Sequence, residues 1–557
     1  MGKMEGVALR KSEALLRLIS SVFVGSLVAA ACAPATTTPG ASASSNPTST
    51  GVVASDKTFV FGIGQNPVGG CDGTQITVTV PVGNCPLLNQ EGLVRFDEVT
   101  KSVAPSLATS WTFDGTSATF KLRQNVKFQD GTPFNADAVV FNYRRVWDTT
   151  FAANTGVKFP LVATIPIASV EKIDDATVKV NFKTARSDTM LLMTTFPAFI
   201  QSPTAVQKTT PADYAFHPVG TGPYKVTSYA DASRFELQRD DSYWGTKPAA
   251  AKIVIVVKQD SAALVSDLLS GAIDASLAPS LEQIDQIKAA GMTIQASPSL
   301  VFYGANFNVT RAPFNDPKIR QAAEYAIDKE SVTALSKGSA KPMYGAVVDG
   351  MREYNADVPA YKYDPKMSGT ILDGLGWTLP AGGKVRMKGG QPLHIDVIQR
   401  TGYTGNTTLL TPLIVSNLQD VGFEVKTVTV EQALQYTPQG YYDINKWDLA
   451  VGGWSASIPD AGTMLGNMLT ANWPTVGFNL GHYTNPQVDQ KVAAAGASFD
   501  EKTHDQLLKD AQLLVRTDAP FLWIFQNQSM VAFNPAKVAA APFRLGGQLD
   551  MLRLQLK

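Results

Sequence analysis

The sequence predicts an α/β protein in which strands and helices alternate in two separate parts of the chain. In the first part, residues 252–258 (KIVIVVK) form an apolar run typical of a buried strand, and residues 261–270 repeat apolar side chains at helical spacing. Residues 271–275 then return to the sheet. In the second part, a helix over 406–421 lies between alternating strand patterns, the second of them over 423–430. Strand, helix and strand at this spacing make a βαβ unit, which is typical of α/β folds.

The composition is that of a globular protein with a sizeable core. At about 100–200 residues per domain, 557 residues suggest two to four domains. Apolar residues make up 44% of the chain and charged residues 17%, which is ordinary for a folded protein. Lysine plus arginine number 48, as do aspartate plus glutamate. This neutral balance gives no argument for binding nucleic acid or an anionic membrane surface, and no nucleic-acid partner is expected.

The N-terminus has the pattern of an export signal. Basic residues precede an apolar run at 18–31, which is shorter than the ~20 residues that a spanning helix needs. The run ends in Ala29-Ala30-Ala31-Cys32, which is similar to a bacterial lipobox, in which the cysteine receives lipid. We therefore expect a signal peptide over 1–31 and lipidation at Cys32. The alternatives are ordinary signal-peptidase cleavage after an Ala-x-Ala site and a buried helix.

The segment that follows predicts a tether. Residues 32–56 are small and polar with repeated proline and glycine, so they cannot bury enough apolar surface to offset the entropy of ordering.

Two cysteines remain beyond Cys32. In an exported protein, an even number of remaining cysteines suggests a disulfide, here between Cys71 and Cys85. A zinc site that uses these two cysteines is one alternative, although neither cysteine has another Cys or a His at ligand spacing nearby. Two free thiols are the other alternative.

The most informative stretch runs from Pro105 to Val146. Residues 108–113 and 117–122 alternate as strands around an Asp-Gly turn, residues 126–128 suggest a third short strand, and Asn135 can cap a helix over 136–146. This stretch (LATSWTFDGTSATFKLRQNVKFQDGTPFNADAVVFNY) resembles the signature of the large extracytoplasmic solute-binding proteins of peptide, nickel and oligopeptide ABC importers. Three further blocks agree in order: GTGPYKVTSY at 220–229, FNVTRAPFNDPKIRQAAEYAIDKESV at 307–332 and PFLWIFQ at 520–526.

The resemblance implies a two-lobed, periplasmic-binding-protein-like fold with an extra subdomain, mixed sheets flanked by helices and a ligand cleft between the lobes. Lobe I is expected to comprise 57–90, 215–305 and 530–557, with the extra subdomain over 91–214 and lobe II over 306–529. The implied function is capture of a peptide or other small solute by lobe closure and delivery to a membrane permease. The expected protein is a monomer without cofactor, held to the outer face of the cytoplasmic membrane by its lipid alone.

The candidate ligand residues combine aromatic, hydroxyl and amide side chains. Loops that follow the carboxyl ends of strands bind ligands in open α/β sheets, and residues 452–460 are predicted to follow such a strand. Packing in the core would explain the presence of each candidate residue about as well as ligand binding does. The candidates are Gln65, Asn66, Tyr303, Asn306, Trp454, Ser455, Ser457 and Asp460.

One position departs from the resemblance. The family's peptide binders place an acidic residue in this loop to pair with the substrate's α-ammonium, and the spacing from Trp454 aligns it with Ser457. A hydroxyl cannot compensate a desolvated ammonium as a carboxylate does, unless Asp460 substitutes for it. An oligosaccharide or a modified peptide therefore becomes a candidate ligand.

Catalytic and metal-binding motifs are lacking in the sequence. The four histidines, His217, His394, His482 and His504, are not paired at a helical metal spacing, and there is no Gly-x-Ser-x-Gly motif. We therefore expect neither an enzyme nor a metal site. A cell-surface hydrolase and a solute sensor that docks a signalling partner remain the alternative functions.

Overall fold

The computed structural model describes residues 55–64, 70–74, 84–157, 165–230, 233–277, 279–456 and 458–557. The predicted signal peptide, Cys32 and nearly all of the predicted tether lie outside these residues. The chain divides into two units, Met1–Thr48 and Ser49–Lys557, and everything below concerns the second. None of its described helices is both long enough and apolar enough to span a membrane.

The main sheet has eleven strands in the order β10-β11-β12-β1-β13-β21-β14-β20-β18-β19, with β15 paired to β21. β1 pairs in parallel with β12 and β13, so β12, α8 (Ser261–Ser270) and β13 form the βαβ unit that the sequence predicts. The strands are β1 (Thr58–Ile63), β10 (Tyr224–Ala230), β11 (Arg234–Arg239), β12 (Lys252–Val257), β13 (Ala275–Leu277), β14 (Thr293–Phe307), β15 (Ala340–Pro342), β18 (His394–Arg400), β19 (Glu424–Val430), β20 (Leu449–Ser455) and β21 (Phe521–Phe533).

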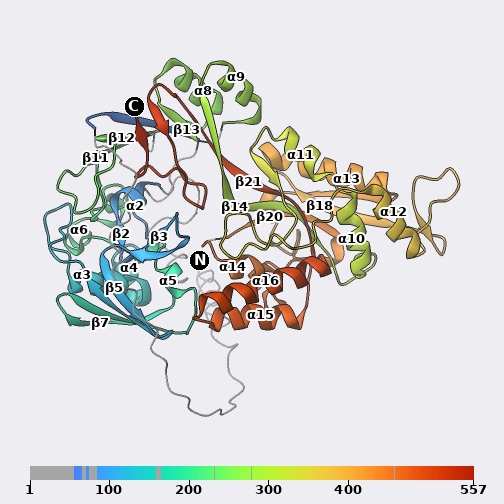
Figure 1. Cartoon of the computed structure of the whole chain (residues 1–557), viewed down its shortest axis with the longest axis horizontal. Helices are drawn as coiled ribbons and strands as arrows, with labels where there is room; N and C mark the ends of the chain where they lie inside the picture. The colour runs from blue at the N-terminus through green and yellow to red at the C-terminus, as the bar shows by residue number, and fades with distance from the viewer. Residues whose placement is uncertain are drawn as a thin grey trace, which may run out of the picture. The chain divides into compact units, whose positions relative to one another are not determined.

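Two long antiparallel strands, β14 and β21, connect the halves of this sheet and run side by side through its middle (Figure 1). Phe533 of β21 packs in a core with Phe59 and Phe61, whereas Leu522 at its other end packs in a second core with Leu449. The two lobes of the α/β fold therefore have separate hydrophobic cores and share continuous strands. The exact lobe boundaries expected from the sequence stay a prediction.

A separate four-stranded antiparallel sheet has the order β5-β6-β8-β7. Its strands are β5 (Ala108–Phe113), β6 (Ser117–Leu122), β7 (Ile167–Asp174) and β8 (Thr177–Phe182). The predicted hairpin is confirmed, and Gly115 supplies the left-handed φ of +93° that its turn requires. The predicted helix is α3 (Ala136–Trp147), and the Asn135 side chain accepts from the N–H of Ala138 as a cap. The third short strand is wrong, because Lys127 makes only an isolated bridge to Pro133.

The remaining helices cover the sheets or connect their strands. They are α2 (Asn84–Asn89), α4 (Thr149–Asn154), α5 (Thr189–Leu192), α6 (Pro203–Lys208), α7 (Pro211–Tyr214), α9 (Ile284–Ala289), α10 (Pro317–Ala326), α11 (Lys329–Leu335), α12 (Pro365–Gly374), α13 (Leu410–Asp420), α14 (Ala461–Leu465), α15 (Pro486–Ala497) and α16 (Glu501–Asp518). Four two-stranded ribbons complete the elements: β2 (Glu91–Gly92) with β9 (Phe199–Ile200), β3 (Val94–Asp97) with β4 (Ser102–Pro105), β16 (Met387–Lys388) with β17 (Gln391–Pro392), and β22 (Val538–Ala540) with β23 (Gln555–Leu556).

The predicted disulfide is confirmed: Cys71 and Cys85 are bonded, with their Cα atoms 5.1 Å apart. Both cysteines are buried in the core that contains Phe59 and Leu88. The bond therefore fixes the start of α2 against the sheet.

Removing this bond should destabilise the protein. In the chain-entropy model, a closed loop of about 15 residues contributes about 3 kcal/mol. We expect Cys71→Ala/Cys85→Ala to lower the free energy of unfolding by about that amount, measured by denaturant titration. Dithiothreitol should lower the stability of the wild-type protein and leave the double variant unchanged; an equal effect on both proteins would contradict the prediction.

Candidate functional site

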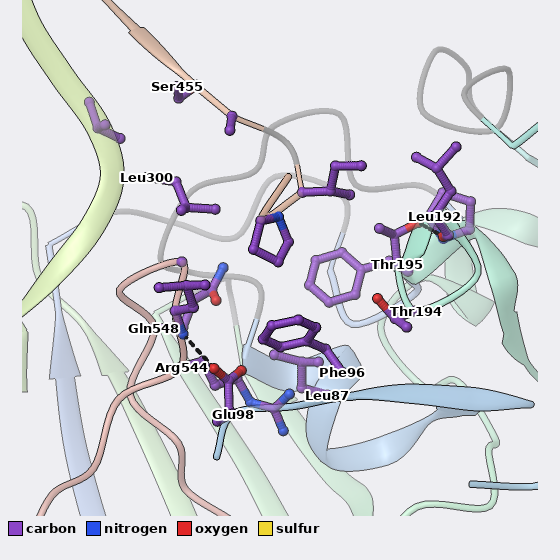
Figure 2. A pocket seen from close by; sticks show the side chains of 18 residues that line it. Leu87, Phe96, Glu98, Leu192, Thr194, Thr195, Leu300, Ser455, Arg544 and Gln548 are labelled. Atoms are coloured by element: carbon purple, nitrogen blue, oxygen red, sulfur yellow. Dashed lines mark hydrogen bonds between the residues drawn. The ribbon is translucent and has the colours of Figure 1, made fainter. Parts of the chain in front are cut away.

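A cavity of about 240 Å³ lies where several separate parts of the chain meet. Figure 2 shows Leu192, Thr194 and Thr195 on the right, Leu300 and Ser455 at the upper left, and Phe96 and Glu98 in the lower part of the view. The walls come from the turn after α5, from β14 and the end of β20, from β3, and from the segment near the C-terminus. The lining residues are Leu87, Phe96, Glu98, Leu192, Thr194, Thr195, Phe196, Pro197, Leu300, Val301, Ser455, Ala456, Ile458, Pro459, Arg544, Leu545, Gly546 and Gln548.

The cavity is mostly apolar with a few polar groups, the usual character of a small-molecule site. Thr194, Thr195, Ser455 and Gln548 offer neutral donors and acceptors. The carboxyl group of Glu98 already has a hydrogen-bond partner within the protein, because its Oε2 accepts a 2.9 Å hydrogen bond from the N–H of Leu545. Burial raises the pKa of this carboxyl group. The volume falls just below the ~300–1,000 Å³ of typical drug-sized sites, which suits a small solute or one portion of a larger one.

One face of the main sheet continues from this cavity. Val301 of β14 lies opposite Ser455 of β20, and two residues further along Tyr303 lies opposite Gly453. Side chains two residues apart share a face, so Tyr303 stands about 7 Å beyond the cavity-lining Val301 on the same side. Gly453 is required here, because a Cβ would lie 2.4 Å from the Tyr303 ring.

Arg400, the last residue of β18, lies close enough to Tyr303 for its positive charge to act on that residue. Its guanidinium carbon lies 4.4 Å from the centre of the Tyr403 ring, and its Nη1 donates to the carbonyl of Thr401. Arg400 is half-buried, and within the part of the chain that the structure describes it forms no ion pair. The charge of Arg400 opposes the rise in the pKa of Tyr303 and Tyr403 that burial causes. A partly desolvated guanidinium without a carboxylate is suited to binding an anion.

Of the predicted site residues, Ser455 lines the cavity and Tyr303 lies on the adjoining face. Trp454 points to the opposite side of β20, where it is 8% exposed and packs 4.8 Å from Phe521. The sequence placed residues 452–455 in a loop, whereas β20 continues to Ser455 because Gly452 and Gly453 pair with β14. This extension corrects the predicted strand end and explains why Trp454 is in the core.

The other predicted residues lie elsewhere. Asn306 is 3% exposed in β14, where its backbone pairs with Ala450 and Phe521. Asp460 caps α14 by accepting from the N–H of Thr463, and it does not line the cavity. Gln65, Asn66 and Ser457 lie outside the described residues.

Sequence reasoning missed most of the cavity wall. The turn at 192–197 and the segment at 544–548 carry no motif, and only the tertiary fold brings them to the cavity. Arg400 could have been found, because it ends β18 and α/β sheets place their ligand sites at the carboxyl ends of strands.

The model of the bacterial extracellular solute-binding proteins, family 5, matches residues 102–475, which is more than half of the chain. The chain belongs to this family. Family 5 proteins are extracytoplasmic binding components of ABC importers and are not enzymes, so the hydrolase alternative is set aside. The two-lobed α/β fold agrees with this assignment.

The relatives of this chain are named for different ligands. The glutathione-binding protein GsiB of Pectobacterium atrosepticum is 29% identical over 80% of this chain and 84% of its own length. The heme-binding protein A of Haemophilus influenzae is 26% identical over 82% of this chain and 88% of its own length. The dipeptide-binding protein of Escherichia coli is 27% identical over 82% of this chain and 86% of its own length.

Solved structures agree with the fold. NikA from Brucella suis, in complex with Fe(III)-EDTA, has a TM-score of 0.76 and 25% identity, covering 90% of this chain and 100% of that one. HbpA2 from Haemophilus parasuis has a TM-score of 0.77 at 21% identity, covering 90% and 100%.

Proposed function

We propose that this family 5 protein captures a small solute with an apolar body and an anionic group, such as a modified peptide, and delivers it to an ABC permease from a lipid anchor at Cys32. The observation that carries the ligand class is Arg400, a half-buried cation without an ion-pair partner among the described residues, whose charge acts on Tyr303 next to the cavity. The apolar cavity walls would hold the body of the solute, and Arg400 its anion.

Capture by closure is supported by where the walls come from. Phe96 and Thr195 belong to the predicted extra subdomain of lobe I, whereas Ser455 and Ile458 belong to predicted lobe II. A solute that contacts both sides stabilises the closed arrangement by its differential affinity for it. The predicted lobe boundaries and a monomeric state belong to this proposal, since one copy supplies every wall.

The ligand class is narrowed by two residues. Ser457 replaces the carboxylate expected for pairing with a free α-ammonium, which disfavours an unmodified peptide. Arg400 favours an anionic solute over an uncharged oligosaccharide. The ligands for which the relatives are named, glutathione, heme and a dipeptide, all carry carboxylates, in agreement with this class.

Native mass spectrometry of the full-length protein, purified in detergent without dialysis, tests the proposal. We expect one noncovalent adduct that carries a carboxylate or another anionic group when it is identified after denaturation. If no adduct survives, a panel of acids and their matched amides is screened for thermal stabilisation, and only the acids should stabilise the protein. An uncharged adduct, or equal response to acids and amides, would refute the ligand class; no response to any solute would refute the binding function.

A further inference from the structure

A cluster of potential metal ligands lies away from the solute cavity. Glu353 comes from the segment between β15 and α12, and His504 and Asp505 from the first turns of α16. One ligand atom from each of the three lies within 4.8 Å of the others. We propose that these three residues bind a divalent transition-metal ion such as Zn²⁺, Mn²⁺ or Co²⁺.

The two nitrogens of His504 face different carboxylates. Nδ1 lies 3.3 Å from Oδ1 of Asp505, and Nε2 lies 3.4 Å from Oδ2 of Asp460. With the proton on Nε2, His504 donates to Asp460 and turns the lone pair of Nδ1 toward Asp505. Metal-binding histidines usually donate their other N–H to a carboxylate, which fixes the tautomer and the ring orientation. Asp460 is therefore the positioning residue for His504, and this role explains its burial.

Glu353 supplies an independent observation. The residue is 2% exposed, and its Oε1 accepts a 3.1 Å hydrogen bond from Nη2 of Arg352. Its Oε2 is buried and has no hydrogen-bond partner among the described residues. A buried charged acceptor without a hydrogen-bond partner destabilises the folded protein. A metal ion in the cluster would satisfy this oxygen.

The charged groups around the cluster also favour binding of a cation. Arg352 pairs with Glu353, Asp505 and Glu501, and Asp460 lies on the other side of His504. When His504 is neutral, these four carboxylates face one guanidinium, so negative charge is in excess. Arg352 contacts Glu353 through Oε1 only, which leaves Oε2 for the metal.

The donor set indicates the class of metal. One imidazole nitrogen with two carboxylates suits Zn²⁺, Mn²⁺ or Co²⁺, whereas Ca²⁺ and Mg²⁺ prefer oxygen ligands throughout. Three protein ligands leave further coordination positions for water. A hollow of about 150 Å³ lies beside Asp460 and His504, and Ser187 and Gly496 also line it.

Titration of the chelator-treated, untagged full-length protein with Zn²⁺ against a chromogenic chelator tests the site, and Co²⁺ absorption reports the imidazole ligand. We expect one equivalent of tight binding. Glu353→Gln and His504→Gln should each weaken it by at least ~10-fold, and Asp460→Asn by about 10–100-fold. Asp505→Asn gives a further test if one of these variants does not fold.

His394→Gln is the matched control. His394 lies 2.8 Å from Glu424 and 3.7 Å from Asp396 on exposed strand ends, so it is the natural place for surface binding of Zn²⁺. The control should bind metal as tightly as the wild type. The proposal is overturned if the wild type binds no metal, if His394→Gln alone abolishes binding, or if folded Glu353→Gln and His504→Gln proteins bind as the wild type does.

Discussion

Replacing Arg400 with methionine should weaken binding of the captured solute by about 30-fold or more. Removing one partner of a partly buried charge pair costs about 2–5 kcal/mol, and each 1.4 kcal/mol corresponds to a tenfold change in affinity. Arg400 carries the only charge proposed to touch the anion, so its removal leaves the anion desolvated and unpaired. The measurement is isothermal titration of the full-length protein with the solute identified by mass spectrometry.

Two variants separate the charge of Arg400 from its packing. Arg400→Lys keeps the charge without the planar fork, and it should recover part of the lost affinity. Arg144→Met is the matched control, since Arg144 also lies over an aromatic ring, 4.5 Å from the centre of Phe151, on the exposed side of α3. The control should bind like the wild type; equal affinities of Arg400→Met and the wild type would remove Arg400 from the site.

Replacing Glu324 with glutamine should lower the free energy of unfolding by about 3–5 kcal/mol. Glu324 is fully buried, and its oxygens lie 2.5 Å from Nη1 of Arg516 and 2.7 Å from Nζ of Lys329. Burial by itself raises the pKa of Glu324, but the attraction of Arg516 and Lys329 outweighs it and holds the pKa below its usual range. The variant leaves two buried cations without their counter-charge.

Denaturant titration of the full-length protein measures this loss. Asp137→Asn is the control, because Asp137 pairs at 2.8 Å with Lys172 where both side chains are well exposed. Exposed pairs contribute about 0–1 kcal/mol, so the control should remain close to the wild type. A loss below 1 kcal/mol for Glu324→Gln would show that the ion pairs of Glu324 with Arg516 and Lys329 do not stabilise the protein.

Local sequence signals predicted the elements whose conformation depends on near neighbours. The Asp114-Gly115 turn, the Asn135 cap and the βαβ unit around α8 all form where the sequence places them. Turn and cap hydrogen bonds join residues a few positions apart, so their chemistry is visible in the sequence. The Cys71–Cys85 bond was predictable for a different reason: with Cys32 expected to carry lipid, one pair of cysteines remained.

Sequence signals failed where a distant strand decided the outcome. The sequence predicts a loop at residues 452–455. Pairing with β14 instead extends β20 through this segment and directs the Trp454 side chain into the core. The same long-range pairing leaves Ser455 at the cavity. No periodicity within the segment could reveal which strand would lie beside it.

The sequence by itself determined the α/β class, the two-lobed family architecture and the disulfide, because local patterns and ordered motifs carry them. Only the tertiary structure decided which side chains meet. It joined 192–197 and 544–548 into one cavity wall, placed Arg400 near Tyr303 without a counter-ion among the described residues, and brought Glu353 to His504 across about 150 positions of the chain. The physical reason is that a site depends on proximity between distant segments, which is fixed by packing and strand pairing and leaves no trace in local spacing.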